Sequence, residues 1–231
     1  MNIAIIIAGG VGARMNQSTP KQFMIIDDKP VIVYTLEKFQ QSEAIDVIAI
    51  ACLDGWQDTI KEYIKKYNLT KLKYIVTGGE TGQQSITNAY NAIKDICDDN
   101  SNILIHDAIR PNISQEIIIN SIKTCDEKGN AVTCIPCPEV MLISKDHIVS
   151  NEEIDRNMLV RTQTPHVFKK HLFDELLSFA KKNNLHNETT IVSLCIKAGK
   201  PIYICQGDMK NIKITFKSDI DIFEALLKTN A

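Results

Sequence analysis

Three stretches of the sequence hold residue types that bind phosphate groups. The first, AGGVGARMNQSTPKQ at residues 8–22, follows the apolar run IAIII and combines three glycines with Arg14 and Lys21. Glycines allow backbone N–H groups to face anionic oxygens. Two cations added to such amides suit a triphosphate better than a single phosphate. The alternative is a tight turn with solvated basic residues.

The first stretch matches neither of the two common phosphate-binding loops. The dinucleotide pattern G-x-G-x-x-G needs a third glycine, and Met15 stands there when the pattern starts at Gly10. The P-loop needs a lysine followed by serine or threonine, whereas Lys21 lies between Pro20 and Gln22. The loop therefore favours neither an NAD-dependent oxidoreductase nor a P-loop protein.

The other two stretches also follow apolar segments. NILIHDAIRP (102–111) ends its apolar run at Asp107, and a lone carboxylate at the carboxyl end of a buried strand often holds Mg²⁺ against nucleotide phosphates. A turn-forming aspartate is the alternative. We interpret His106 as a buried partner, because no second histidine lies at metal-ligand spacing. In GGETGQQS (78–85), the glycines would let a backbone edge contact a flat base.

The elements that must position these stretches alternate along most of the chain. We predict strands at residues 2–7, 46–52, 73–77, 102–111, 131–137 and 201–207, with 211–215 as a strand or loop. We predict helices at residues 30–40, 56–66, 85–96, 114–125, 168–182, 188–199 and 219–229. Repeated β-α-β order with nearly continuous apolar strands predicts an α/β fold with a mainly parallel sheet and helices on both faces. The three stretches would then meet at one edge of that sheet.

Residues 138–163 break this rhythm, because short apolar pairs alternate there with turn residues. The pattern predicts a β-hairpin arm or insertion. The sequence contains no repeat, low-complexity tract or linker. We therefore expect one domain, residues 1–231, that carries an arm.

Composition excludes several function classes. The net charge of −2 gives no basic field that would draw the protein to nucleic acid. No stretch reaches about 18 apolar residues, and the first strand is too short for a signal peptide. We expect a cytoplasmic protein that binds neither nucleic acid nor membrane. Cys134 and Cys137 form a C-x-x-C pair within a strand-like run, which favours a structural over a redox or metal role.

Five motifs, taken in order, resemble the cytidylyltransferases of the methylerythritol-phosphate and ribitol-phosphate type. In this chain they read AGGVGARMNQSTPKQ, GGETGQQSI, HDAIRP, DRNMLVRTQTP and NIKIT. Each motif alone is weak, but five in the same order over nearly the whole chain are specific. The resemblance implies a Rossmann-like nucleotidyltransferase that transfers CMP from CTP to a polyol phosphate and releases pyrophosphate.

The resemblance also implies how the nucleotide is bound. Arg14, Lys21 and Lys213 would neutralise charge on the reacting phosphates. Asp107 would coordinate Mg²⁺, or another divalent cation, between CTP and the second substrate. The residues implied to line the nucleotide are Ala8, Gly9, Gly10, Gly12, Gly79, Glu80, Ser85 and Ala108.

On the acceptor side, the resemblance implies a homodimer. Arg156 and Thr164, from the arm region, would bind the phosphate of the second substrate in the neighbouring subunit's site. The arm would thus swap across a two-fold axis. Thr189 would contact the polyol phosphate or the loop near the base, or would only start a helix.

Two positions depart from the family pattern. Gly82 stands where the family usually has arginine, and Gln83 or Gln84 could replace its hydrogen bonds but not its charge. Thr190 stands where the methylerythritol type carries an acidic residue. We therefore favour a linear alditol phosphate, such as ribitol 5-phosphate for surface polysaccharide, over 2-C-methyl-D-erythritol 4-phosphate. A non-catalytic nucleotide-binding scaffold is the alternative from another class.

Overall fold

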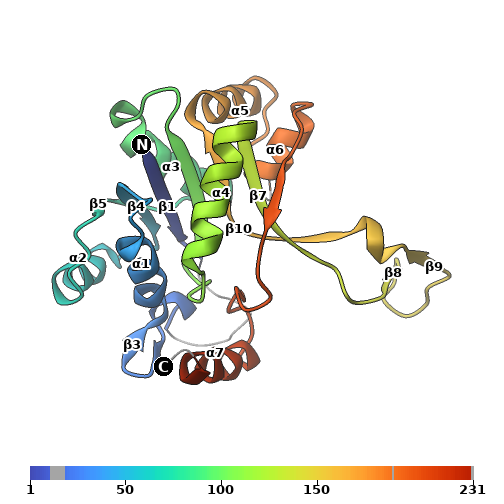
Figure 1. Cartoon of the computed structure of the whole chain (residues 1–231), viewed down its shortest axis with the longest axis horizontal. Coiled ribbons are helices and arrows are strands. Elements are labelled where there is room, and N and C mark those ends of the chain that lie inside the picture. Colours follow the sequence, from blue (N-terminus) through green and yellow to red (C-terminus); the bar gives the residue numbers. More distant parts are fainter. Residues whose placement is uncertain (11–18, 189, 230–231) are drawn as a thin grey trace.

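A computed structural model of the chain describes residues 1–10, 19–188 and 190–229. Within these residues, seven strands form one sheet in the order β11-β7-β10-β6-β1-β4-β5 (Figure 1). β10 is antiparallel to both neighbours, and all other neighbouring pairs are parallel. The prediction of a mainly parallel α/β sheet is confirmed. The strands are β1 (Asn2–Ala8), β4 (Val47–Cys52), β5 (Leu72–Thr77), β6 (Asn102–Asp107), β7 (Asn130–Pro136), β10 (Val160–Lys169) and β11 (Ile204–Gln206).

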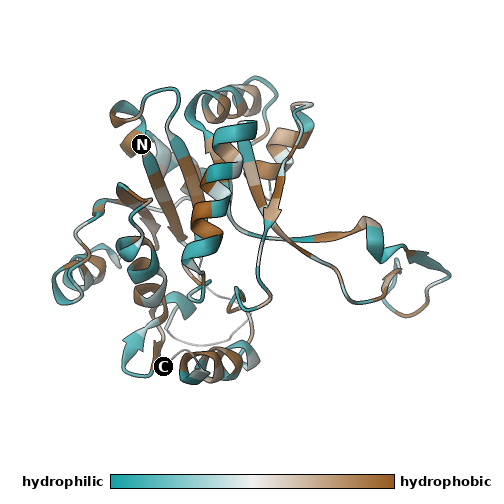
Figure 2. Cartoon of the chain, viewed as in Figure 1, coloured by the Kyte–Doolittle hydropathy of each residue, from teal (hydrophilic) through white to brown (hydrophobic). Residues whose placement is uncertain are grey.

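Helices cover both faces of the sheet, as predicted. α1 (Val31–Gln41), α2 (Gln57–Lys66) and α4 (Gln115–Lys128) bury apolar side chains on one face. α3 (Gly82–Ile93), α5 (Lys170–Lys182) and α6 (Ile191–Lys197) do so on the other. Apolar residues accordingly run along the strands between these layers (Figure 2). None of the described helices is long and apolar enough to cross a membrane.

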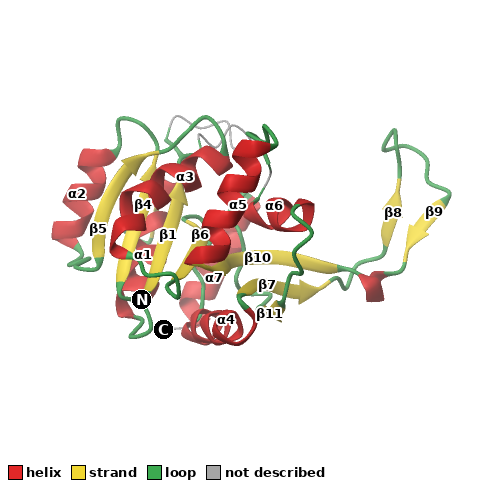
Figure 3. Ribbon diagram, turned by 90° about the horizontal axis from the view of Figure 1, so that it is seen from above, coloured by secondary structure: helices red, strands yellow, loops and turns green. Residues whose placement is uncertain are grey.

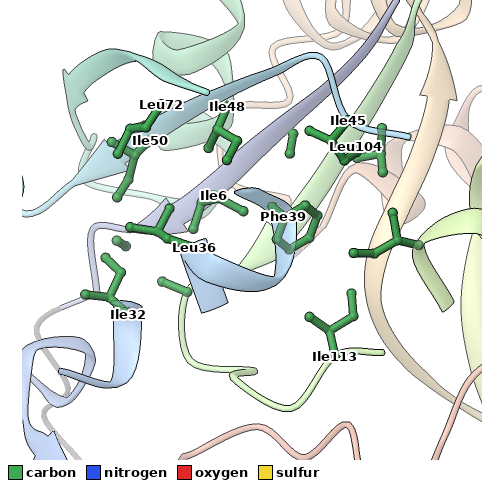
Figure 4. Close-up of a cluster of buried hydrophobic side chains, with 14 of the residues drawn as sticks. Ile6, Ile32, Leu36, Phe39, Ile45, Ile48, Ile50, Leu72, Leu104 and Ile113 are labelled. Carbon is green, nitrogen blue, oxygen red and sulfur yellow. The ribbon is translucent and has the colours of Figure 1, made fainter. Parts of the chain in front are cut away.

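Side chains of β1 show how one strand serves both layers. Ala4 and Ile6 belong to the cluster with α1, whereas Ile3 and Ile5 belong to the cluster with α3. This alternation is the two-residue period of a strand. Figure 4 shows Ile6 among the side chains of α1 and its neighbours. A smaller cluster joins α7 (Ser218–Thr229) to the hairpin of β2 (Ile25–Ile26) and β3 (Lys29–Pro30).

Helix starts are fixed by side chains that the sequence supplies locally. The side chain of Thr81 accepts a hydrogen bond from the backbone N–H of Gln84 at the start of α3. Ser114 does the same for α4, and Thr190 does the same for α6. Such caps satisfy N–H groups that have no partner within the helix. α4 ends at Gly129, whose φ of +92° is a left-handed conformation that glycine adopts at little cost.

The segment between β7 and β10 extends away from the sheet. Its strands β8 (Met141–Ile143) and β9 (Glu152–Ile154) pair with each other in a separate two-stranded sheet. Both side-on and top views show this hairpin projecting from the rest of the chain (Figures 1 and 3). Many of its apolar side chains are exposed, namely Val140, Met141, Leu142, Ile143, Ile148, Val149 and Met158.

β10 is a strand that the sequence pattern did not predict. It begins at Val160, so residues 160–163, expected in the arm, belong to the main sheet. Its first half is polar and contains Pro165, which cannot donate a ladder hydrogen bond. The pairing with β7 shifts register between Thr162 and His166, around this proline. Residues 211–215, left open between strand and loop, form a loop.

Candidate active site

Two glycine-containing loops lie against each other at the carboxyl edge of the sheet. A Cβ atom on Gly78 would lie 3.2 Å from Cα of Gly9 and 3.2 Å from Oγ of Ser85. The loops after β1 and β5 therefore touch backbone to backbone, although β4 separates the two strands. Ser85 Oγ accepts a hydrogen bond from the N–H of Gly79 (2.9 Å) and donates one to the carbonyl of Thr81 (3.0 Å). These contacts hold the second loop in place.

The first loop is anchored by Gln22, which sequence reasoning did not single out. Its Nε2 donates to the carbonyl oxygens of Ala8 (2.7 Å) and Gly10 (3.0 Å), and its side chain is buried. Lys21, also buried, is the neighbouring residue in the turn η2 (Lys21–Phe23). The glutamine stood within the quoted PKQ motif, which was the available signal. Gly12 and Arg14 lie outside the described residues.

The remaining residues expected near the nucleotide differ in exposure. Glu80 is exposed, and its N–H is hydrogen-bonded to Oε1 of Gln84 (3.0 Å). Ala108 is fully buried, and its carbonyl accepts from Oγ1 of Thr35 (2.7 Å). This hydrogen bond from α1 therefore fixes the backbone of the turn at Ala108.

Asp107 is the centre of a charged cluster at the end of β6. Its Oδ2 lies 3.0 Å from Nζ of Lys213 and 3.2 Å from Nε of Arg110. Arg110 also donates to the carbonyl of Asn211 (2.8 Å), which ties the 211–215 loop to β6. Burial alone would raise the pKa of Asp107, but the charges of Lys213 and Arg110 outweigh it and lower that pKa to about 2. The carboxylate is thus ionised at neutral pH.

Thr164 holds Asp107 from the side. Its Oγ1 accepts from the N–H of Asp107 (3.1 Å) and lies 3.1 Å from Nδ1 of His106. Nε2 of His106 lies 3.2 Å from the carbonyl of Arg110, which can only accept, so Nε2 carries the proton and Nδ1 accepts from Thr164. Burial lowers the pKa of His106 to about 3, which keeps the ring neutral. The expectation that His106 is a buried partner is confirmed.

This arrangement differs from the expected place of Thr164. Sequence reasoning grouped it with the arm and placed it in the neighbouring subunit's site, whereas it lies in β10 beside Asp107 of its own chain. The reason is that β10 enters the sheet at residue 160. Arg156, by contrast, lies on the arm in the turn η4 (Arg156–Met158), where it donates to the carbonyl of Pro138 (2.9 Å). The structure does not bring Arg156 to its own chain's Asp107.

A cavity of about 220 Å³ lies beside this cluster. β6 and β10 form one wall with Asp107, Thr164 and His166, and the starts of α3 and α6 form another with Gly82 and Thr190. His166 was not predicted, because no motif or spacing marks it. Thr189 lies outside the described residues.

Gln83, in the first turn of α3, connects that helix to the segment before α6. Its Nε2 donates to the carbonyl of Leu185 (2.7 Å), and its Oε1 accepts from the N–H of Glu188 (2.9 Å). Both ends of this amide are engaged by the segment before α6, and Oε1 of Gln84 accepts from the N–H of Glu80. Whether either glutamine replaces the hydrogen bonds of the missing arginine stays a prediction. A Cβ at Gly82 would meet no atom within 4 Å.

The cysteine pair was expected to have a structural role, and both thiols are placed in the interior. Cys134 lies in β7, and both Cys134 and Cys137 are buried free thiols. Burial raises the pKa of Cys134 to about 11, so it is not a thiolate at neutral pH. Across the described residues, no group of three or more His, Cys, Asp or Glu side chains could hold a metal ion.

The chain is similar to known proteins over almost its whole length. The family model described as 2-C-methyl-D-erythritol 4-phosphate cytidylyltransferase matches residues 2–229. The chain is 37% identical to a ribitol-5-phosphate cytidylyltransferase from Lacticaseibacillus paracasei, covering 99% of this chain and 98% of that protein. It is 35% identical to a 2-C-methyl-D-erythritol 4-phosphate cytidylyltransferase from Clostridium acetobutylicum, covering 100% and 99%. It superposes with a TM-score of 0.80 on the crystal structure of the Francisella tularensis 2-C-methyl-D-erythritol 4-phosphate cytidylyltransferase, at 26% identity over 97% of this chain and 98% of that one.

Proposed function

Because the chain belongs to the 2-C-methyl-D-erythritol 4-phosphate cytidylyltransferase family and is a CTP-dependent cytidylyltransferase, we propose that its acceptor is an alditol phosphate, ribitol 5-phosphate before others. The observation that carries this proposal is the charged cluster of Asp107, Arg110 and Lys213 beside a cavity. That cluster suits two phosphorylated substrates. The product would be a CDP-alditol for surface polysaccharide.

The reaction needs charge stabilisation more than covalent chemistry. A phosphate oxygen of the acceptor attacks the α-phosphorus of CTP, one P–O bond forms, and the bond to the leaving pyrophosphate breaks. The acceptor phosphate is already an anion, so no general base is required. Lys213 and Lys21, with Arg14, would stabilise the negative charge that develops on the phosphates. Asp107 and Arg110 hold Lys213 and the 211–215 loop in position.

The single carboxylate of Asp107 fits a divalent cation. Both protein cations contact Oδ2, which leaves Oδ1 for the metal ion. Mg²⁺ commonly takes only one or two protein carboxylates and completes its shell with phosphates and water. Bound there, Mg²⁺ or another divalent cation would supply further positive charge between the two substrates.

The acceptor assignment is supported by Thr190 and by the relatives. Thr190 lines the cavity and caps α6 with a neutral hydroxyl, at the position where the methylerythritol type has an acid. Relatives from Lacticaseibacillus paracasei and Vibrio parahaemolyticus, both 37% identical, are ribitol-5-phosphate cytidylyltransferases. The second candidate is 2-C-methyl-D-erythritol 4-phosphate, which the 35% identical clostridial relative supports.

The arm supports a homodimer. Its exposed apolar residues would be buried against a second copy of the chain, and Arg156 would then reach the acceptor phosphate in the partner's site. We also propose that the enzyme acts in the cytoplasm, where CTP is available.

The proposal is tested by a screen for pyrophosphate release. CTP, UTP, ATP and GTP are each combined with ribitol 5-phosphate, 2-C-methyl-D-erythritol 4-phosphate and other alditol phosphates, with Mg²⁺ and with a chelator. We expect turnover with CTP and ribitol 5-phosphate that stops in chelator. Faster turnover with the methylerythritol substrate would overturn the acceptor assignment. CTP binding by calorimetry without turnover on any acceptor would favour the non-catalytic scaffold.

A further inference from the structure

The side chain of Lys213 extends from a loop, so its position depends on what fixes the backbone of that loop. The side chain is 39% exposed, and its ion pair with Asp107 holds only the tip. On the C-terminal side of the lysine, the N–H of Ile214 donates to the carbonyl of Ile109 (2.9 Å), and Ile214 is fully buried. On the N-terminal side, the backbone is held at Asn211.

The amide of Gln163, a residue of β10, holds the turn of residues 208–211. Gln163 is 5% exposed. Its Nε2 donates to the carbonyl of Asp208 (2.8 Å), and its Oε1 accepts from the N–H of the same residue (3.3 Å). The same Nε2 donates to the carbonyl of Asn211 (3.4 Å), and the same Oε1 accepts from Nδ2 of Asn211 (3.4 Å). Both ends of one buried amide are thus engaged by a single turn.

Asn211 connects this turn to the charged cluster. It is fully buried, its Nδ2 donates to the carbonyl of Thr164 (3.0 Å), and its own carbonyl accepts from Nη1 of Arg110 (2.8 Å). Arg110 and Lys213 both contact Oδ2 of Asp107. A buried polar network whose members are bonded at several points is rigid. The backbone two residues before Lys213 is therefore fixed from β10 and from the turn after β6.

Gly207 allows the turn to approach β10 closely. A Cβ atom there would stand 2.5 Å from Oε1 of Gln163, 3.0 Å from Cγ2 of Thr133 and 3.1 Å from the carbonyl oxygen of Cys134. Any larger residue would displace the amide of Gln163 or the turn itself. The turn and the side chain of Gln163 are therefore fitted to each other.

We propose that Gln163 is a positioning residue for Lys213, which acts on the reaction through the 208–211 turn and not by contact with a substrate. The proposal rests on the proposed function, in which Lys213 stabilises charge on the reacting phosphates. A fixed cation stabilises a transition state effectively because it need not reorganise during the reaction. Without the amide of Gln163, the backbone that carries Lys213 would move, so kcat should fall while CTP binding stays the same.

A double-mutant cycle on the full chain tests this proposal. The readout is pyrophosphate release from CTP and ribitol 5-phosphate, or 2-C-methyl-D-erythritol 4-phosphate if that acceptor is faster. Gln163→Met, which keeps the length of the side chain and removes the amide, should lower kcat by about 10–10²-fold, the cost of a small misplacement. The KM for CTP and the Mg²⁺ dependence should stay the same. In the Lys213→Ala background, Gln163→Met should lower kcat no further. Gln41→Met, at an exposed glutamine that ends α1, is the matched control and should retain wild-type kcat.

The outcomes separate the inference from the proposed function. Wild-type kcat in Gln163→Met, or a loss of kcat that is as large without Lys213 as with it, would overturn the inference alone. A shifted Mg²⁺ dependence would show that Gln163 acts through Asp107 and would also overturn it. Wild-type kcat in Lys213→Ala, or no turnover with any acceptor, would overturn the proposed function.

If Gln163→Met does not fold, hydrogen exchange in the wild-type protein still decides. The side-chain amide protons of Gln163 and the N–H of Asp208 should exchange slowly, because they are hydrogen-bonded to each other's segments. Fast exchange at both groups would show that the turn is not held by Gln163 and would contradict the inference.

Discussion

Nζ of Lys213 lies 3.0 Å from Oδ2 of Asp107, so the loop after β11 is ion-paired to the last residue of β6. This ion pair holds the ammonium group of Lys213 beside the cavity, at the end of β6. In the proposed mechanism, removing Lys213 would take away charge stabilisation from the transition state.

Lys213→Ala should therefore lower kcat by about 10²–10³-fold, the range for losing one preorganised electrostatic group. Its KM for CTP should change much less. Lys210→Ala, which removes an exposed cation three residues away, is the matched control. Equal kcat values for the two variants would refute a catalytic role for Lys213. Steady-state pyrophosphate release measures both.

Loss of the Gln83 amide should loosen the segment before α6. In Gln83→Ala, the hydrogen bonds to Leu185 and Glu188 are absent, so we expect faster amide exchange at residues 185–188 and a KM for the acceptor several-fold higher. Asn91→Ala, on the exposed side of α3, should change neither. Unchanged exchange in Gln83→Ala would show that the bridge is not what orders this segment.

An arginine at position 82 should be accommodated and should tighten nucleotide binding. The space beside Gly82 is open, and the position borders the cavity near Asp107. We expect Gly82→Arg to melt within a few degrees of the wild-type protein and to lower the KM for CTP, with an effect that weakens as salt is added. Gly82→Met, which adds a long unbranched side chain without charge, is the control for bulk. A KM for CTP that rises equally in both variants would contradict this prediction.

Two buried histidines should make the protein less stable in mild acid. Burial lowers the pKa values of His106 and His166 from 6.5 to about 3 and about 4. Between pH 6.5 and about 4 the unfolded chain therefore binds more protons than the folded one. Stability that is present above pH 6.5 is lost as the pH falls through this window, at a limiting slope of about 1.4 kcal/mol per pH unit for each histidine.

Urea unfolding from pH 7 to pH 5 measures this slope. His106→Gln should reduce the slope of the unfolding free energy with pH by the contribution of one histidine, at most about 1.4 kcal/mol per pH unit. The variant should nevertheless be less stable than the wild-type protein at every pH. His171→Gln, which removes an exposed histidine on α5, is the control for the substitution itself. A slope in His106→Gln equal to that of the wild-type protein would show that His106 is not held neutral in the folded state.

If the arm forms the dimer interface, a single charged substitution on it should disrupt the dimer. Leu142 is 61% exposed on β8, and in a dimer its side chain would be buried, so Leu142→Asp should shift the protein toward monomer. Ile119→Asp changes a similarly exposed residue on α4 and should leave the assembly intact. Sedimentation velocity distinguishes the outcomes. A monomeric wild-type protein would remove the basis for placing Arg156 in a partner's site.

How far the sequence leads depends on the kind of signal. Apolar periodicity located the layered fold, because strands such as β1 and β6 are buried on both faces and read as continuous apolar runs. Glycine loops and Asp107 were visible because strand ends mark the edge of a parallel sheet. β10 escaped this reasoning since its first half, from Val160 to Pro165, is polar where it borders the cavity. Gln22 stood within the PKQ motif, but its anchoring bonds to Ala8 and Gly10 could not be read from spacing. Gln83 binds the backbone of Leu185, 102 residues away, and local spacing carries no trace of that contact.

The chain leaves the sheet along β7 and returns along β10, its neighbour. β10 carries Thr164, whose hydroxyl holds the backbone of Asp107. A displacement of the arm would therefore be transmitted along one continuous strand to Asp107, the carboxylate proposed to hold the metal ion. In a dimer in which each arm packs against the opposite subunit, a movement of one subunit would reach Asp107 of the other through the arm and β10. The sites of the two subunits would then be mechanically coupled without a hinge or an additional domain.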